Sequence, residues 1–172
     1  MLAPLRFASL CFVLCAVCAA SAAEQAKIFV QIEGVNGEHA EAGMEGAIRA
    51  EKLEYRLERS ASKSFASKLG IEKRPNSLSF VKGLDRATPQ LAKCVKDGRR
   101  VRTLTIKVFQ APQPGEALKH IFTLTLSNAT VTSIDVFADE TSGGRPLETV
   151  TVDYEEIDLK SETSGEQATI GK

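Results

Sequence analysis

The chain has no tryptophan and only two histidines among its 172 residues. The lack of tryptophan argues against an aromatic cage, and the two histidines, His39 and His120, lie far apart in the sequence, which argues against a histidine-based metal site. The motifs G-x-S-x-G and H-E-x-x-H and the P-loop are also absent. Glu155 and Glu156 are neighbours on an expected strand, where they point to opposite faces and make a poor acid/base pair. The sequence therefore predicts no enzyme activity, no cofactor and no metal site.

Long apolar runs are also missing, and the one apolar stretch lies near the start of the chain. Arg6 precedes an uncharged apolar run over residues 7–20, which is shorter than the about 20 residues of a membrane-spanning helix. Small residues follow up to Ala23. A positive charge, an apolar run and small residues, in that order, are typical of a secretory signal peptide. We therefore predict a signal peptide over residues 1–23, cleaved after Ala22 or Ala23.

An uncleaved membrane anchor and a lipoprotein signal are the alternatives for this segment. A lipoprotein signal places leucine three residues before the modified cysteine, whereas Cys18 and Cys15 have Cys15 and Phe12 there. Cleaved export predicts a periplasmic or secreted protein with no membrane contact after cleavage. Three of the four cysteines leave with the leader, so Cys94 has no partner for an internal disulfide.

The mature chain has no strong excess of either charge. Cleavage after Ala23 leaves 149 residues with 21 basic and 22 acidic side chains, because Arg6 is the only charged residue of the leader. A net charge near −1 argues against nucleic acid or an anionic lipid surface as the main partner. The length suits a single domain with a real core.

Period-two alternation dominates the mature sequence. Apolar side chains alternate with polar ones in runs around residues 28–32, 53–57, 104–108, 122–126 and 150–154, and residues 77–81 form a short run of the same kind. Glycine, proline and asparagine separate these runs, which favours an antiparallel sandwich or barrel. Beyond Asn128 the alternation resumes in a shifted phase, so a hairpin or a β-bulge is expected there.

One stretch, from Leu84 to Arg100, has a helical period instead. Thr88 can cap a helix, Pro89 suits its first turn and Gly98 suits the residue after its end. Leu91, Cys94 and Val95 share one face, so Cys94 is expected to be a small buried hydrophobe. The predicted fold is mainly β, an antiparallel two-sheet barrel or sandwich with one short flanking helix.

Two segments have opposite charge. Residues 58–76 hold five basic and two acidic side chains, and residues 153–166 hold six acids against Lys160. Both can be plain solvated faces, or a positive arm of one subunit can meet a negative edge of the next. The interface residues predicted on the second interpretation are Arg59, Lys63, Lys68, Lys73, Arg74, Asp153, Glu155, Glu156 and Asp158. The last residues, 161–172, are predicted to be a disordered tail.

Several stretches in order resemble the Hcp family, the haemolysin-coregulated proteins of type VI secretion systems. They are IFVQIEGVNGEH, LSFVKGLDRATPQLAKCVKDG, LTIKVF, IFTLTLSNATVTSI and ETVTVDYEEIDL. The most specific is the second, in which a strand and a lysine precede Asp-x-x-Thr-Pro-x-Leu. The resemblance covers about residues 27–159 and implies an Hcp-like β-barrel domain over residues 24–160.

The resemblance also implies a function. Family members form homohexameric rings that stack into a tube, which a contractile sheath pushes out behind a spike protein and whose lumen can carry effector proteins. The long segment after the second strand resembles the arm with which family members touch neighbouring subunits.

The predicted leader is the main departure, because tube subunits assemble in the cytoplasm and are then secreted. Either the protein has left the secretion apparatus or the leader is not used. An exported β-sandwich binding module, monomeric or dimeric with a ligand on a sheet face, is the alternative function.

Overall fold

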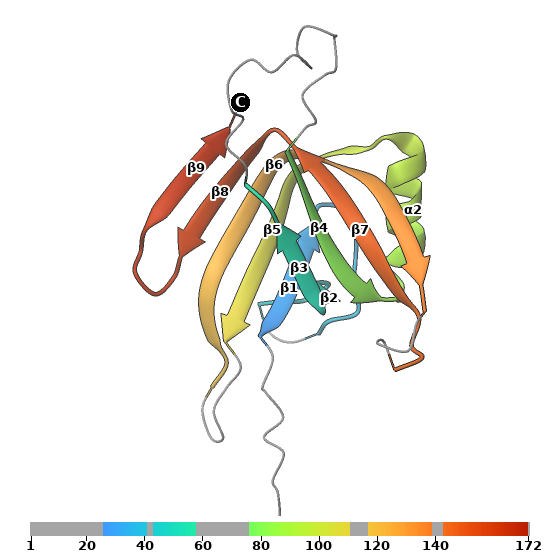
Figure 1. Ribbon diagram of the computed structural model, residues 1–172, viewed down its shortest axis with the longest axis horizontal. Helices are drawn as coiled ribbons and strands as arrows, with labels where there is room; N and C mark the ends of the chain where they lie inside the picture. The colour runs from blue at the N-terminus through green and yellow to red at the C-terminus, as the bar shows by residue number, and fades with distance from the viewer. Residues whose placement is uncertain (1–25, 41–42, 58–75, 111–116, 139–142, 172) are drawn as a thin grey trace, which may run out of the picture.

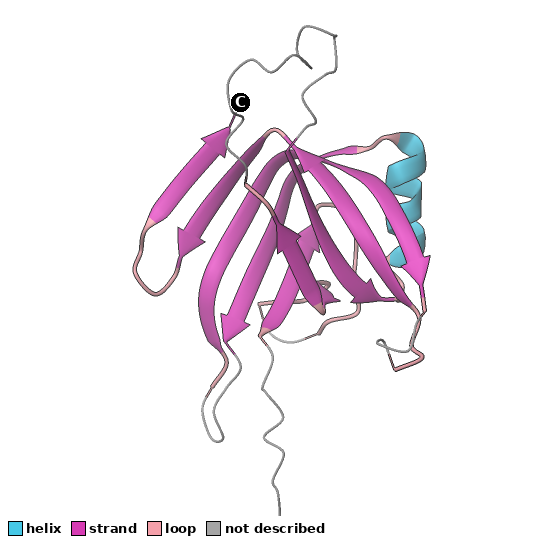
Figure 2. Ribbon diagram, in the orientation of Figure 1, coloured by secondary structure: helices cyan, strands magenta, loops and turns pink. Residues whose placement is uncertain are grey.

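The computed structural model describes residues 26–40, 43–57, 76–110, 117–138 and 143–171 (Figure 1). These residues form an antiparallel sheet with one helix on its flank (Figure 2). The strands are β1 (Lys27–Ile32), β2 (Ile48–Ala50), β3 (Lys52–Tyr55), β4 (Asn76–Gly83), β5 (Arg100–Gln110), β6 (Lys119–Phe137), β7 (Leu147–Tyr154), β8 (Glu156–Ser161) and β9 (Gln167–Gly171). The helix is α2 (Thr88–Asp97). The prediction of a mainly β antiparallel fold with one flanking helix is confirmed.

The two ends of the main ladder are consecutive in the chain. The strand order is β2-β1-β5-β6-β7-β4-β3, with β8 and β9 added beside β6. β2 and β3 are separated only by Glu51, whose N–H donates to the Val81 carbonyl at 2.8 Å. The sheet therefore curls until its ends meet at one bent strand, although its hydrogen-bonded ladder does not close into a complete barrel.

The interior of the curled sheet holds the core that the alternation predicts. Fully buried side chains come from the helix and from most strands, although not from β3 or β9, and include Val30, Phe80, Leu91, Leu104, Leu126 and Val152. Burying one such side chain contributes about 1.5–3 kcal/mol. Cys94 is buried among them, as predicted for a small hydrophobe.

β6 is one long strand with a bulge, so the phase shift in the sequence does not mark a hairpin. Its first part pairs with β5 and β8, and its last part, from Thr130, pairs with β7. Asn128 has a positive φ of 52° at the point where the partners change. The register with β5 is unbroken at Asn128, since Val101 lies opposite Ala129 and Thr103 opposite Ser127. The bulge against β7 lies further along β6, between Val131 and Ser133. Two successive residues nevertheless separate the core-facing Leu126 and Ala129, as the shifted alternation indicates.

The helix begins one residue earlier than a Thr88 cap implies. Ala87 is the N-cap residue and makes no side-chain capping bond, while Thr88 is the first helical residue. The Thr88 hydroxyl instead accepts the Asp85 N–H at 3.2 Å, and the Asp85 carboxylate accepts the Ala87 N–H at 2.8 Å. Gly98 ends the helix in the left-handed conformation, as predicted.

The prediction of a disordered tail over residues 161–172 is wrong for most of its length. Gln167–Gly171 forms β9 and pairs with β8, and the Ser161 N–H donates to the Glu166 carbonyl at 2.9 Å. The polar composition suggested disorder, but a strand needs only a neighbour with free backbone groups, and β8 supplies them.

Candidate functional site

The four acids predicted at a subunit interface lie along one stretch of chain where β7 passes into β8. Asp153 is in β7 opposite Thr130 of β6 and Ser77 of β4. Glu156 and Asp158 are in β8, and Glu155 occupies the one-residue break between the strands. We call these four residues the acidic junction. The basic residues predicted to meet them, Arg59, Lys63, Lys68, Lys73 and Arg74, lie outside the described residues.

Two members of the acidic junction already have partners in their own chain. Glu155 accepts a hydrogen bond from the Asn128 side-chain amide at 2.9 Å and lies 3.2 Å from the Arg100 guanidinium. Asp158 accepts the hydroxyl of Thr169 on β9. These contacts fasten the strand break and the terminal hairpin, so we assign both carboxylates mainly to the fold.

Asp153 and Glu156 have no hydrogen-bond or ion-pair partner within the described part of the chain. Asp153 is half-buried, and burial raises the pKa of its carboxyl above the ordinary value. Glu156 is exposed. These two carboxylates are therefore the members of the acidic junction best placed to meet cations from another chain.

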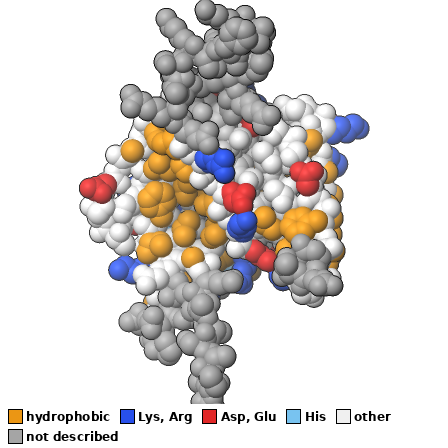
Figure 3. All heavy atoms as spheres, in the orientation of Figure 1, with side chains coloured by type: hydrophobic (Ala, Val, Ile, Leu, Met, Phe, Trp, Pro, Cys, Tyr) orange, Lys and Arg blue, Asp and Glu red, His pale blue; other side chains and the backbone are white. Residues whose placement is uncertain are grey.

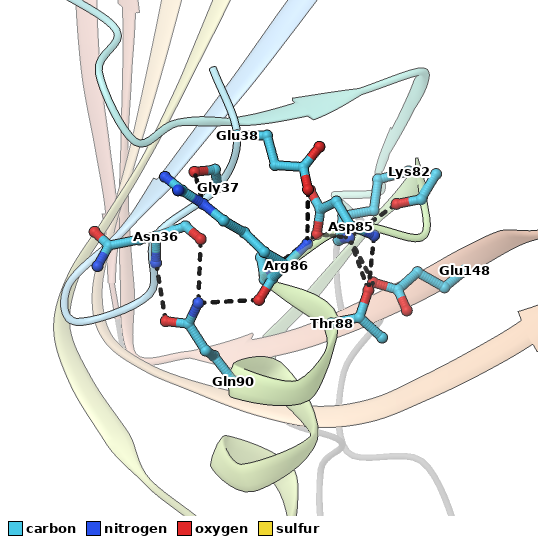
Figure 4. Close-up of polar contacts among 11 residues, drawn as sticks. Asn36, Gly37, Glu38, Lys82, Asp85, Arg86, Thr88, Gln90 and Glu148 are labelled. Atoms are coloured by element: carbon cyan, nitrogen blue, oxygen red, sulfur yellow. Dashed lines mark hydrogen bonds and ion pairs between the residues drawn. The ribbon is translucent and has the colours of Figure 1, made fainter. Parts of the chain in front are cut away.

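A buried ion pair lies beneath the start of the helix. Lys82 and Glu148 are opposite each other on β4 and β7, both fully buried, with Nζ 2.7 Å from Oε1 (Figure 4). Lys82 Nζ is also 2.7 Å from Asp85 Oδ1, and the Thr88 hydroxyl donates to Glu148 Oε1 at 3.0 Å. Strands β4 and β7 are thus joined to the first turn of α2, and this accounts for the Lys and Asp-x-x-Thr residues of the sequence motif. We call these four residues the helix anchor.

A second set of contacts ties the same helix to the loop after β1. The Arg86 Nε–H donates to the Gly37 carbonyl at 2.6 Å, and its backbone N–H donates to Glu38 at 3.1 Å. Gln90 exchanges hydrogen bonds with the backbone of Asn36 at 3.1 and 3.2 Å (Figure 4). Gly37 lies against the Ala47 backbone so closely that a Cβ there would collide with it. The loop is held in one place by these contacts.

The alternation in the sequence also indicates that two residues of the helix anchor face the core, an indication that the sequence analysis did not use. Lys82 has the parity of Leu78 and Phe80, and Glu148 has the parity of Val150 and Val152. Two opposite charges at core-facing positions of strands indicate a buried pair. Their partnership follows from strand register, which the sequence alone does not give.

The described residues also enclose a polar cleft of about 790 Å³ beside the helix anchor. Its charged lining residues are Lys27, Glu38, Arg49, Glu51, Asp85 and Arg145. Within the described part of the chain there is no group of three or more His, Cys, Asp or Glu side chains that could hold a metal ion. Nor does any helix among those residues have the length and apolar character to cross a membrane.

The curled antiparallel sheet, the anchored helix α2 and the pairing order define the described part of the chain as a mainly β domain. A sequence model described as "Type VI secretion system effector, Hcp" matches residues 29–160. The chain belongs to the Hcp family and is a type VI secretion tube-like protein. The family resemblance found in the sequence is thereby confirmed.

Solved Hcp structures share this fold at low sequence identity. Hcp1 from Salmonella typhimurium is 17% identical with a TM-score of 0.66, covering 84% of this chain and 91% of that one. Hcp1 from E. coli EAEC 042 is 18% identical with a TM-score of 0.65, covering 85% and 96%. A type VI secretion system effector from Yersinia pestis is 18% identical with a TM-score of 0.65, covering 84% and 99%. Among curated proteins, no sequence matches this chain.

Proposed function

We propose that the protein is a ring-forming structural subunit that assembles into homohexamers, which stack as the inner tube of a type VI secretion system. The observation that carries this proposal is the family match over residues 29–160 on a chain with the Hcp fold. Such a tube would have three kinds of partner: effector proteins in its lumen, a spike protein at its tip and a contractile sheath around it.

The acidic junction supplies one half of the proposed subunit contact. Asp153 and Glu156 have no partner in the described part of their own chain, and they lie where Asn76, the first residue of β4, pairs with Tyr154. A closed ring needs two unlike surfaces on each subunit. We propose that the basic residues Lys73 and Arg74 of one subunit meet the acidic junction of its neighbour.

We also propose that residues 1–23 are removed as a signal peptide. The first strand begins at Lys27, so cleavage after Ala22 or Ala23 leaves the whole sheet intact. The mature protein would then be periplasmic or secreted. N-terminal sequencing of protein taken from the native cell tests this, since a chain that begins at Met1 would show that the leader is retained.

The solution mass tests the ring. Light scattering on the purified protein should give about six times the subunit mass, and electron microscopy should show rings with a central opening. A protein that stays monomeric over the whole accessible concentration range would overturn the ring. It would favour the alternative, an exported binding module that kept the fold.

A further inference from the structure

The polar cleft beside the helix anchor lies at the end of the curled sheet where β1 begins and β4 ends. Figure 3 shows charged side chains of both signs over β2 and β3, whereas apolar side chains gather over β6 and β8. Most small-molecule sites are lined mainly by apolar side chains. A cleft of about 790 Å³ with a charged lining therefore favours a small charged solute over an apolar ligand.

The carboxylates that line the polar cleft already have partners in their own chain. Asp85 forms an ion pair within the helix anchor at 2.7 Å. Glu51 lies 2.6 Å from the Arg145 guanidinium, and Glu38 accepts the backbone N–H of Arg86 at 3.1 Å. These contacts use the negative charge of the lining, so the cleft has little capacity left to attract a cation.

Two cations of the lining, Lys27 and Arg49, have no hydrogen-bond or ion-pair partner within the described part of the chain. Phe29 lies directly opposite Arg49 in the ladder between β1 and β2, and Lys27 precedes Phe29 by two residues. Both cations therefore lie on one face of the sheet as diagonal neighbours, with Cα atoms about 7–8 Å apart. Two uncompensated positive charges in one concave site attract an anion.

The walls of the polar cleft are held in place without a ligand. Phe29, the common neighbour of the two cations, is buried, and the His39 ring packs on it with 4.5 Å between ring centroids. The His39 N–H donates to the Ala47 carbonyl at 3.2 Å, and the Gly46 N–H donates to the His39 carbonyl at 2.8 Å. The helix anchor fixes the opposite wall at Asp85. A ligand that binds between fixed walls loses little free energy to ordering the protein.

We propose that the polar cleft binds a small organic dicarboxylate, with one carboxylate group on Arg49 and the other on Lys27. A guanidinium binds a carboxylate through two parallel N–H···O bonds, and an ammonium binds one as a compact charge. Two cations separated along the sheet suit two separate anionic groups better than a single one. The site does not depend on the proposed ring, because all of its lining residues belong to one subunit.

Isothermal titration calorimetry of the full-length protein with succinate tests the site. Succinamide is the matched ligand control, because it has the same carbon chain and no charge. The variants K27Q and R49Q each remove one of the two cations. K93Q is the matched control variant, because Lys93 is an exposed residue of α2 that does not line the polar cleft. Inorganic phosphate serves as a probe with a single anionic group.

The expected result is saturable binding of succinate and none of succinamide. K27Q and R49Q should each weaken succinate binding by about tenfold or more, because each loses a charged hydrogen-bond donor. K93Q should bind as the unchanged protein does. Succinate that does not bind, or that binds K27Q and R49Q as tightly as the unchanged protein, would overturn the site. Phosphate that binds as tightly as succinate would overturn its assignment to a dicarboxylate.

Discussion

Lys82 and Glu148 face each other across β4 and β7 with 2.7 Å between Nζ and Oε1, and neither side chain reaches solvent. Removing one partner of a buried pair leaves an uncompensated charge, which costs about 3–5 kcal/mol. Replacing both by apolar residues of similar volume is often neutral or stabilising. The pair therefore orients α2 on the sheet more than it adds to stability.

Replacement of Lys82 by Met should lower the free energy of unfolding by about 3–5 kcal/mol, because Glu148 and Asp85 then lose the cation between them. The double variant K82M/E148L should recover most of this loss. Urea unfolding followed by circular dichroism measures both. A double variant as unstable as K82M would show that the pair is needed for more than mutual neutralisation.

Asn128 should be replaceable by glycine at little cost in backbone energy, because its φ of 52° is a conformation that glycine adopts freely. N128A should be less stable than N128G by about 1–2 kcal/mol, since alanine is strained in the left-handed region. Both variants lose the hydrogen bond to Glu155, so the difference isolates the backbone effect. Equal unfolding midpoints for the two would mean that the strand relaxes at this position.

Neutralising Asp153 should stabilise the isolated subunit at neutral pH. Burial raises the folded-state pKa of this carboxyl above its unfolded value, so the ionised form disfavours folding at pH values above the folded pKa. The gain in melting temperature of D153N should be full near pH 7, should fall as the pH drops below the folded-state pKa, and should vanish below about pH 3, where the carboxyl is protonated in both states. Thermal unfolding at several pH values checks this, and a gain that grows as the pH falls would contradict it.

The contact between basic segment and acidic junction can be tested by exchanging charges between two variants. K73E/R74E alone should not form the ring, because its segment, now acidic, would face Asp153 and Glu156 of the neighbouring subunit. D153K/E156K alone should not form it either, because its junction, now basic, would face Lys73 and Arg74 of the neighbour. Mixing the two variants should restore rings in which they alternate, since each interface again joins opposite charges. Light scattering of the mixture against each variant alone gives the result.

If the basic residues instead met the acids of their own chain, mixing would restore nothing. The combined variant K73E/R74E/D153K/E156K assembles under either arrangement and serves as the folding control. K160E is a surface control, because it changes the charge at one site by the same amount as each of the other substitutions. It should leave the ring intact, since Lys160 is already paired with Glu162 of its own chain at 2.8 Å.

Particular residues show how much of the fold could be predicted from the sequence. Leu104, Leu126 and Val152 were predicted to face inward, and all three are fully buried, because strand side chains alternate whatever the strands' partners are. The phase shift after Asn128 was also visible, but its choice between hairpin and bulge was open. The structure excludes the hairpin, because β5 and β7 pair with the two parts of one continuous strand, and it places the bulge against β7 between Val131 and Ser133.

The sequence by itself determined the class of fold, the family and the helix, since alternation, turn residues and motif order are local properties of the chain. Only the tertiary structure decided that Lys82 meets Glu148, that residues 167–171 form a strand and that Glu155 is held by Asn128 and Arg100. Each of these depends on the register between segments distant in sequence. Register is set by the packing of the whole sheet around its core, and no local pattern encodes it.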